Sequence, residues 1–363
     1  MNISVLRRFL LCACSLALLF VITLPAPVAY AADQQEQYIK ARVVSIGEAS
    51  SDGQVPAQLQ VELLEGELKG EQVPTSAAFA PTVADSIAVG DVVVVSANEL
   101  QKGGTVYQAS DYYRTPVLLA LFVVFLMLVI AVSRLRGVAS FMGMVITFWI
   151  ISGMVVPQIL AGTNPIVVST LAVILMLPVI FYLAHGVSAK TTIAVVSTFI
   201  TLLLTSILAY VMVQVAHLSG LSDEQIFFVD ALRSRLYVAQ DLLVAGIVIG
   251  ALGVLDDISI SQTSIVYELK KANKDLSPRA LFSHAMAVGR DHVASLVNTL
   301  VLVYAGAALP LFLIFTESGI PLDVGLSSEL VATEAVRILV ASIGVVSSVP
   351  ITTALAAHFA GRS

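Results

Sequence analysis

The sequence predicts an α-helical polytopic membrane protein with about seven transmembrane helices and a small N-terminal β-rich domain outside the cell. Of its 363 residues, 58% are hydrophobic and only 12% are charged, and the mean hydropathy is +0.92. Soluble globular proteins carry about 25% charged residues, because a surface that faces water needs them. A surface that faces lipid holds charge only at a cost in free energy. The composition therefore excludes an ordinary soluble domain.

The N-terminus has the pattern of a signal peptide. Arg7 and Arg8 precede an apolar run, and Ala29-Tyr30-Ala31 then places small residues at the spacing of a cleavage site. We predict a signal peptide over residues 1–31; an uncleaved first helix is the alternative. In both cases residues 32–114, which follow it, lie outside the cell.

The two cysteines, Cys12 and Cys14, both fall inside the predicted signal peptide. After cleavage the protein has no thiol, which excludes a disulfide, a cysteine metal site and a cysteine nucleophile.

Residues 32–114 are polar, and short segments within them alternate between apolar and polar residues. Such alternation, with many β-branched residues, favours strands. We expect a small barrel or sandwich, OB-like in the first instance. The segment has no His and no Cys, so we expect a folded spacer or docking module. The predicted strands are Tyr38–Ile46, Gln58–Leu64, Asp91–Ser96 and Val106–Ala109.

Residues 115–363 form the predicted transmembrane domain. A helix needs about 20 apolar residues to cross the hydrocarbon core of a bilayer. The stretches that satisfy this length are Pro116–Ser133, Val138–Val156, Pro165–Ala184, Thr191–Ala216, Val238–Ile260, Val293–Thr316 and Ala335–Phe359.

The charges between these stretches predict the orientation in the cell membrane. With residues 32–114 outside, nearly all basic residues between spans fall inside, as the positive-inside rule requires. The loop from Glu317 to Glu329 is acidic and falls outside. The C-terminus is then cytoplasmic. The inner basic residues are Arg134, Arg136, Lys190, Lys270, Lys271, Lys274, Arg279 and Arg362; Arg233 and Arg235 are the exceptions.

The fifth span combines small and acidic residues. Gly246 and Gly250 form a small-xxx-small pair with Gly253 near the same face, which predicts close approach of another helix. Asp256 and Asp257 follow near the inner end. Paired carboxylates at this depth can bind a cation or carry a proton. The alternative is that both lie in the headgroup layer and end the helix.

The sixth span begins with a second polar group. Asp291 and Asn298 are seven residues apart and share a helix face. Arg290 is predicted to pair with Asp256 or Asp257 across the two helices, because a buried charge is tolerated when paired. An ordinary positive-inside anchor is the alternative for Arg290, and an interhelical hydrogen bond is the alternative for Asn298.

Three prolines interrupt the apolar spans. Pro350 in span seven frees a backbone carbonyl, and Pro178 in span three and Pro310 in span six raise the same possibility. Broken helices of this kind often line transport sites, although helix packing explains the small residues around Pro350 equally well.

Several motifs resemble the YibE/F-like family of bacterial membrane proteins. The run from Gly250 to Gln262, followed by Tyr267-Glu-Leu269, is similar to the family's central signature. Gly289-Arg-Asp291, Asn298-Thr-Leu300 and Tyr304-Ala-Gly306 also fit, whereas Asp257 departs from the pattern. Arg114 to Gly137, Gly162-Thr-Asn-Pro165 and Gly344 to Thr352 extend the resemblance over nearly the whole mature chain. The resemblance implies an extracytoplasmic N-terminal region followed by several spans, and it implies no established reaction.

These patterns favour a permease or channel for a small solute or ion. Its path would be lined by Asp256, Asp257, Arg290, Asp291 and Asn298. A non-catalytic envelope scaffold, docked through the β-rich domain, is the alternative. An intramembrane aspartyl protease using Asp256 and Asp291 is disfavoured, because the Gly-x-Gly-Asp run of such enzymes is absent. We expect no catalytic residues, metal or cofactor.

The expected partners follow from the same composition. They are the lipid bilayer and either a second copy of the chain or an envelope protein that contacts the β-rich domain. No nucleotide-binding loop and no basic patch for nucleic acid is present in the sequence.

Overall fold

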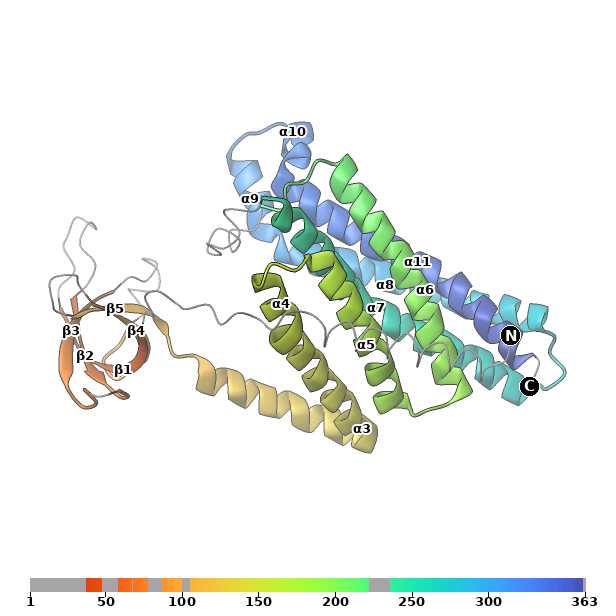
Figure 1. Ribbon diagram of the computed structural model, residues 1–363, viewed down its shortest axis with the longest axis horizontal. Coiled ribbons are helices and arrows are strands. Elements are labelled where there is room, and N and C mark those ends of the chain that lie inside the picture. The colour runs from red at the N-terminus through yellow and green to blue at the C-terminus, as the bar shows by residue number, and fades with distance from the viewer. Residues whose placement is uncertain are drawn as a thin grey trace. The chain divides into compact units, whose positions relative to one another are not determined.

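A computed structural model describes residues 37–47, 58–66, 68–77, 87–99, 105–221 and 236–361 (Figure 1). The predicted signal peptide lies outside the described residues. The structure is mostly helical and begins with a small barrel of strands. The chain divides into two compact units between Ala131 and Val132.

The first unit contains a closed five-stranded barrel, in which the strands follow the order β1-β2-β3-β5-β4. All neighbours are antiparallel except β3 and β5, which are parallel. This order is that of an OB-fold, so the barrel alternative of the prediction is confirmed. The strands are β1 (Gln37–Ile46), β2 (Gln58–Leu63), β3 (Gln72–Ala77), β4 (Val92–Glu99) and β5 (Thr105–Tyr112).

The alternating sequence builds the barrel core. In β2 the side chains of Leu59, Val61 and Leu63 are buried, whereas Gln58 and Gln60 between them are exposed. Neighbouring residues of a strand point to opposite faces, so a period of two fills the interior with apolar groups. The sequence missed β3, because Pro74 interrupts its short run; Pro74 pairs with Gln60 of β2.

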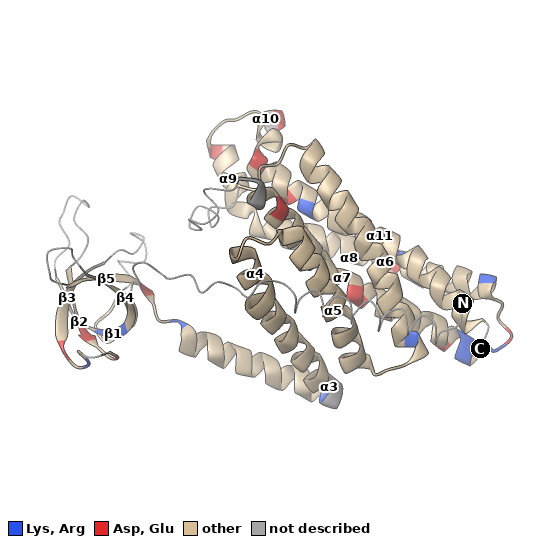
Figure 2. Ribbon diagram, viewed as in Figure 1, with Lys and Arg blue, Asp and Glu red and all other residues tan. Residues whose placement is uncertain are grey.

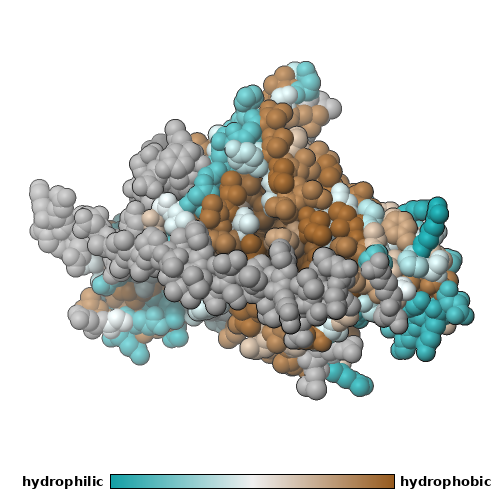
Figure 3. Space-filling model, turned by 45° about the vertical axis from the view of Figure 1, so that its right-hand side comes forward, coloured by the Kyte–Doolittle hydropathy of each residue, from teal (hydrophilic) through white to brown (hydrophobic). Residues whose placement is uncertain are grey.

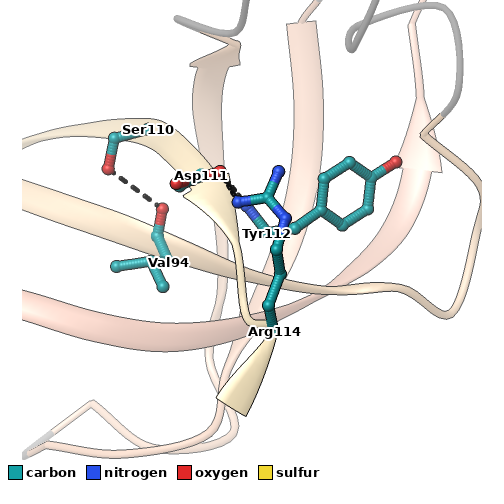
Figure 4. A network of polar contacts seen from close by, with 5 residues as sticks. All are labelled: Val94, Ser110, Asp111, Tyr112 and Arg114. Atoms are coloured by element: carbon teal, nitrogen blue, oxygen red, sulfur yellow. Dashed lines mark hydrogen bonds and ion pairs between the residues drawn. The ribbon is translucent and has the colours of Figure 1, made fainter. Parts of the chain in front are cut away.

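The barrel ends in a polar contact beside the first long helix (Figure 4). Arg114 donates to the Asp111 carboxylate at 2.5 Å, and the backbone N–H of Tyr112 donates to the same oxygen at 2.8 Å. The Arg114 hydrogen bond and then that backbone hydrogen bond hold the pKa of Asp111 below its usual range. The Arg114 guanidinium also lies 5.7 Å from the Tyr112 ring centroid.

Long helices make up the rest of the described chain. They are α3 (Thr115–Ile150), the π-helical turn η1 (Ile151–Val155), α4 (Val156–Leu160), α5 (Pro165–His185), α6 (Ala189–Val215), α7 (Leu236–Ala272), α8 (Pro278–Ala307), α9 (Leu309–Glu317), α10 (Leu322–Ser327) and α11 (Glu329–Ala360).

Six of these segments are long and apolar enough to cross a membrane, and α8 with α9 makes a seventh if the bent pair is one span. Each predicted span corresponds to one of them. α3 contains the first span and the start of the second, which continues through η1 and α4; the two are separated where Arg134 takes a φ of 54°. The sixth is broken as its proline indicates: α8 and α9 meet at 57°, and Pro310 lies in the first turn of α9. Pro178 and Pro350, in contrast, lie within the unbroken helices α5 and α11.

In the second unit, α6, α7 and α11 pack against one another, with α8 against α11 and α5 against α7. Gly344 allows a close approach in this centre: a Cβ there would lie 2.6 Å from Thr205 Oγ1 of α6. Figure 3 shows hydrophobic residues over the middle of the bundle and hydrophilic residues toward its ends. That distribution is expected of helices that cross a bilayer.

Candidate functional site

A buried polar cluster occupies the centre of the bundle, where α7, α8 and α11 meet. Gln262 of α7 is fully buried, and its amide nitrogen donates to the Ala285 carbonyl of α8 and to Thr353 Oγ1 of α11, both at 2.8 Å. One turn away, Ser259 Oγ lies 3.2 Å from Ser348 Oγ. Hydrogen bonds of this kind join helices in a membrane, where water is absent as an alternative partner.

Gly289 makes room for this cluster. A Cβ at position 289 would lie 2.6 Å from Val349 Cγ1 and 3.0 Å from Gln262 Nε2. Gln262 Oε1 has no hydrogen-bond partner among the described residues. It lies 3.1 Å from the same Cβ position and therefore faces the glycine. We assign the cluster to helix packing, because uncharged groups fill it and the Gln262 oxygen meets a backbone.

The hydroxyl groups of α6 are also satisfied locally. Thr198, Thr201 and Thr205 are buried, and each donates to the carbonyl four residues earlier at 2.9 Å. Such bonds let polar residues lie within an apolar bundle. The polar groups described in the packed centre are thus hydroxyl groups and the Gln262 amide, all of them uncharged.

Asp256 and Asp257 lie on α7 within the segment Ala239–Ala272, which is long and apolar enough to cross a membrane. Asn164, the N-cap of α5, donates to Asp241 of α7 at 2.5 Å, so the start of α5 lies level with Asp241. The 21 residues of α5 rise about 30 Å, the thickness of the hydrocarbon core. The same rise along α7 ends near Ser261. The two carboxylates are therefore roughly 6–8 Å inside that end.

Asp257 shares an open face of α7 with three glycines. Gly246, Gly250, Gly253 and Asp257 are all exposed and follow one another at intervals of four, three and four residues. We call this set the α7 open face. A Cβ at Gly246 or Gly253 would meet nothing within 4 Å, and at Gly250 it would meet only the Tyr304 hydroxyl, at 3.8 Å. The predicted close helix contact at these glycines is therefore wrong for the described chain; Gly289 and Gly344 have that role.

Arg290 does not pair with either carboxylate. No ion pair joins it to Asp256 or Asp257 within the part of the chain that the structure describes, so that prediction is wrong. The reason is rotation: Gly289 faces Gln262 of α7, and the next residue points about 100° away. Arg290 instead lines a pocket of about 270 Å³ between α8 and α11, together with Met286, Val293, Val346, Val349 and Pro350.

Asp291 and Asn298 are both exposed on α8, in agreement with their spacing. Because Gly289 faces α7, a residue two positions later points to the opposite side of α8. The structure therefore does not bring Asp291 together with Asp256, and a two-aspartate protease site is not formed by these residues. Among the described residues, no group of three His, Cys, Asp or Glu side chains could hold a metal ion.

One polar contact at the other end of the bundle was not predicted. Glu329, the first residue of α11, accepts hydrogen bonds from the Ser219 hydroxyl and N–H at 2.6 Å and from the Gly220 N–H at 3.2 Å. It thereby fixes the segment that follows α6. Sequence reasoning missed it because the partners are 110 residues apart.

The barrel, the apolar helices and the polar residues on them define a multi-pass membrane protein with a small β-barrel at its N-terminal end. A family model described as YibE/F-like protein matches residues 121–362, and the chain belongs to that family. The suspected resemblance is confirmed. No curated protein and no solved structure matches the chain.

Proposed function

We propose that this protein is a permease or channel for a small solute or ion, and that Asp256 and Asp257 act on a cation or proton as it passes. The observation that supports this is the position of the two carboxylates: Asp257 lies on the α7 open face, and the half-buried Asp256 directly precedes it. They lie beside glycines and lack an ion-pair partner in the described chain.

The physical argument concerns the cost of charge in lipid. An Asp at the centre of a membrane helix costs about 2.5–3.5 kcal/mol, so such residues usually face water or a partner. The glycines beside Asp257 leave a strip of α7 without side chains, along which a small solute can approach the backbone. A water-filled route along this face would hydrate the carboxylates and let them interact with a passing cation or proton.

We further propose that the barrel lies outside the cell and the C-terminus in the cytoplasm, and that the protein is not an enzyme. Figure 2 shows acidic residues around α9 and α10 and a group of basic residues at the opposite end of the bundle. Basic residues favour the cytoplasmic side. The end that carries the α7–α8 loop is then the inner end.

A non-catalytic envelope scaffold is the second candidate. It is supported by the barrel, which has its own core and is a compact unit. In this role the barrel would dock another envelope protein and the helices would anchor it.

Flux into proteoliposomes tests the proposal. The purified full chain is reconstituted, and entry of H⁺, Na⁺, K⁺ and Mg²⁺ is followed with indicator dyes. We expect flux of at least one ion, reduced by Asp257→Asn and by Asp256→Asn. Glu268→Gln is the matched control, because Glu268 is an exposed carboxylate on the same helix beyond Ser261. An inactive parent protein, or equal flux in all variants, would contradict the proposal.

A further inference from the structure

A second open face lies on α8 and has the spacing of a coiled-coil seam. Its residues follow at intervals of four, three, four, three and four positions, which is the heptad pattern. All are exposed except Ala305, which is half-buried. We call this set the α8 seam; its members are Ala287, Asp291, Ala294, Asn298, Val301 and Ala305.

The polar members of the seam require a partner. Gly289 packs against Gln262, close to the end of the hydrocarbon core, and Asn298 is nine residues further on. That is about 13 Å deeper along the helix. An amide surrounded by hydrocarbon is costly when its hydrogen bonds are unmade. Asn298 makes no hydrogen bond in the described chain, so we infer that another protein surface covers this face.

We infer that the covering surface is the same face of a second copy, and that two chains associate through α8. Both copies enter the membrane in the same orientation, so the two α8 helices run parallel and equal residues meet at a two-fold axis. Asn298 then lies opposite Asn298 of the second copy. A single Asn at this position of a seam pairs with itself and selects a parallel dimer. The alanines permit close approach of the two backbones.

Charge complementarity supports self-association. Arg290 immediately precedes Asp291, and neither has an ion pair within the described residues. In a parallel pair of helices, a seam residue packs into a hole that includes the residue just before its counterpart. Asp291 therefore meets Arg290 of the second copy, and Arg290 meets its Asp291. The two reciprocal ion pairs thus join Arg290 and Asp291, which have no ion-pair partner within the described residues of one chain.

Disulfide cross-linking tests the interface. Replacing Cys12 and Cys14 by Ser gives a chain without thiols. In that background Val301→Cys places one thiol in the seam and leaves Arg290, Asp291 and Asn298 intact. Thr299→Cys is the control, because Thr299 is also exposed, lies two residues away and is outside the seam.

Oxidation in native membranes should give covalent dimers of the Val301→Cys chain, at least about tenfold more than of the Thr299→Cys chain. Equal cross-linking of the two would indicate random collision and overturn the inference. Absence of dimers in both would overturn it as well.

Charge reversal then tests the pairing. Arg290→Asp and Asp291→Arg, each in the Val301→Cys chain, place like charges at the interface. Each should lower the dimer fraction about tenfold, because like-charge contacts oppose association. When the two variants are co-expressed with different tags, opposite charges meet again and a mixed dimer should form. The pairing would be refuted if the dimer fraction of the single variants stayed at the level of the Val301→Cys chain. A mixed dimer no more abundant than either homodimer would refute it as well.

Discussion

Substituting Gly289 by Ala tests how closely α8 packs against Val349 and Gln262 in the polar cluster. The added Cβ would lie 2.6 Å from Val349 Cγ1, and ordinary contact starts at 3.4 Å, so about 0.8 Å of movement is needed. Val349 is 1% exposed and belongs to α11, which leaves it little room. The same Cβ meets both polar atoms of the Gln262 amide at 3.0 and 3.1 Å.

The expected magnitude follows from three contributions. Overpacking costs about 1–3 kcal/mol. Displacing Gln262 from one of its two hydrogen bonds costs about 0.5–1.5 kcal/mol. Replacing Gly by Ala within a helix gains about 0.5–1 kcal/mol. We expect Gly289→Ala to lower the free energy of unfolding by about 0.5–4 kcal/mol.

Gly253→Ala is the matched control. It makes the same chemical change within a helix, but its Cβ meets nothing within 4 Å. Only the helix-propensity gain remains, so stability should rise by about 0.5–1 kcal/mol. Unfolding of the full chain by sodium dodecyl sulfate in mixed micelles, followed by circular dichroism, measures both. If the two substitutions change stability in the same direction and by the same amount, the packing assigned to Gly289 is refuted.

Three further predictions concern the anchoring loop and the barrel. Glu329→Ala should lower the free energy of unfolding by about 1.5–3 kcal/mol, because three donors lose a charged acceptor. Glu329→Gln should cost less, since its amide oxygen still accepts hydrogen bonds. Equal thermal stability of the two variants in detergent would contradict this. Val61→Ala should destabilise the barrel by about 2–3 kcal/mol, because Val61 is fully buried. Val89→Ala is the control: Val89 is 64% exposed, so the thermal midpoint of barrel unfolding should change little. Asp111→Asn should cost at most about 0.5 kcal/mol, since the carboxylate and Arg114 are both more than half exposed. Because the pKa of Asp111 is lowered in the folded chain, this stabilisation is present above the unfolded pKa and is lost as the pH falls through the folded one. A pH titration in which the stability difference between parent and Asp111→Asn stays the same as the pH falls through that range would contradict the assignment.

The spans were predictable from sequence because the membrane sets a length that apolar stretches must satisfy. β1 and β2 were predictable because a half-buried strand alternates, and β4 because its four consecutive valines are β-branched. β3 was not, because Pro74 removes a ladder hydrogen bond and weakens the strand pattern. The order of the strands in the barrel depends on long-range pairing, so the sequence suggested the OB-like order only as one of several possibilities.

Side-chain environments were harder to predict than helices. Spacing indicates which residues share a face, and Gly246, Gly250 and Gly253 do share one. It does not indicate what that face meets, and the close contacts were found at Gly289 and Gly344 instead. The proposed pairing of Arg290 failed for the same reason: the two helices are neighbours, but one residue of rotation separates the side of α8 that contacts α7 from the side that carries the guanidinium.

These outcomes explain where the charges of this bundle lie. The packed centre is held by uncharged groups that bond within their own helix, such as Thr201, or donate to neighbouring helices, such as the Gln262 amide nitrogen. A charge at that place would need a fully buried counter-ion, and geometry leaves no position for one beside Gly289. Asp257 and Asp291 are instead exposed, on faces where helices do not pack in the described chain. On the α7 open face, Asp257 lies beside bare backbone, which suits a passing solute. On the α8 seam, Arg290 and Asp291 are adjacent and opposite in charge, which suits an identical surface.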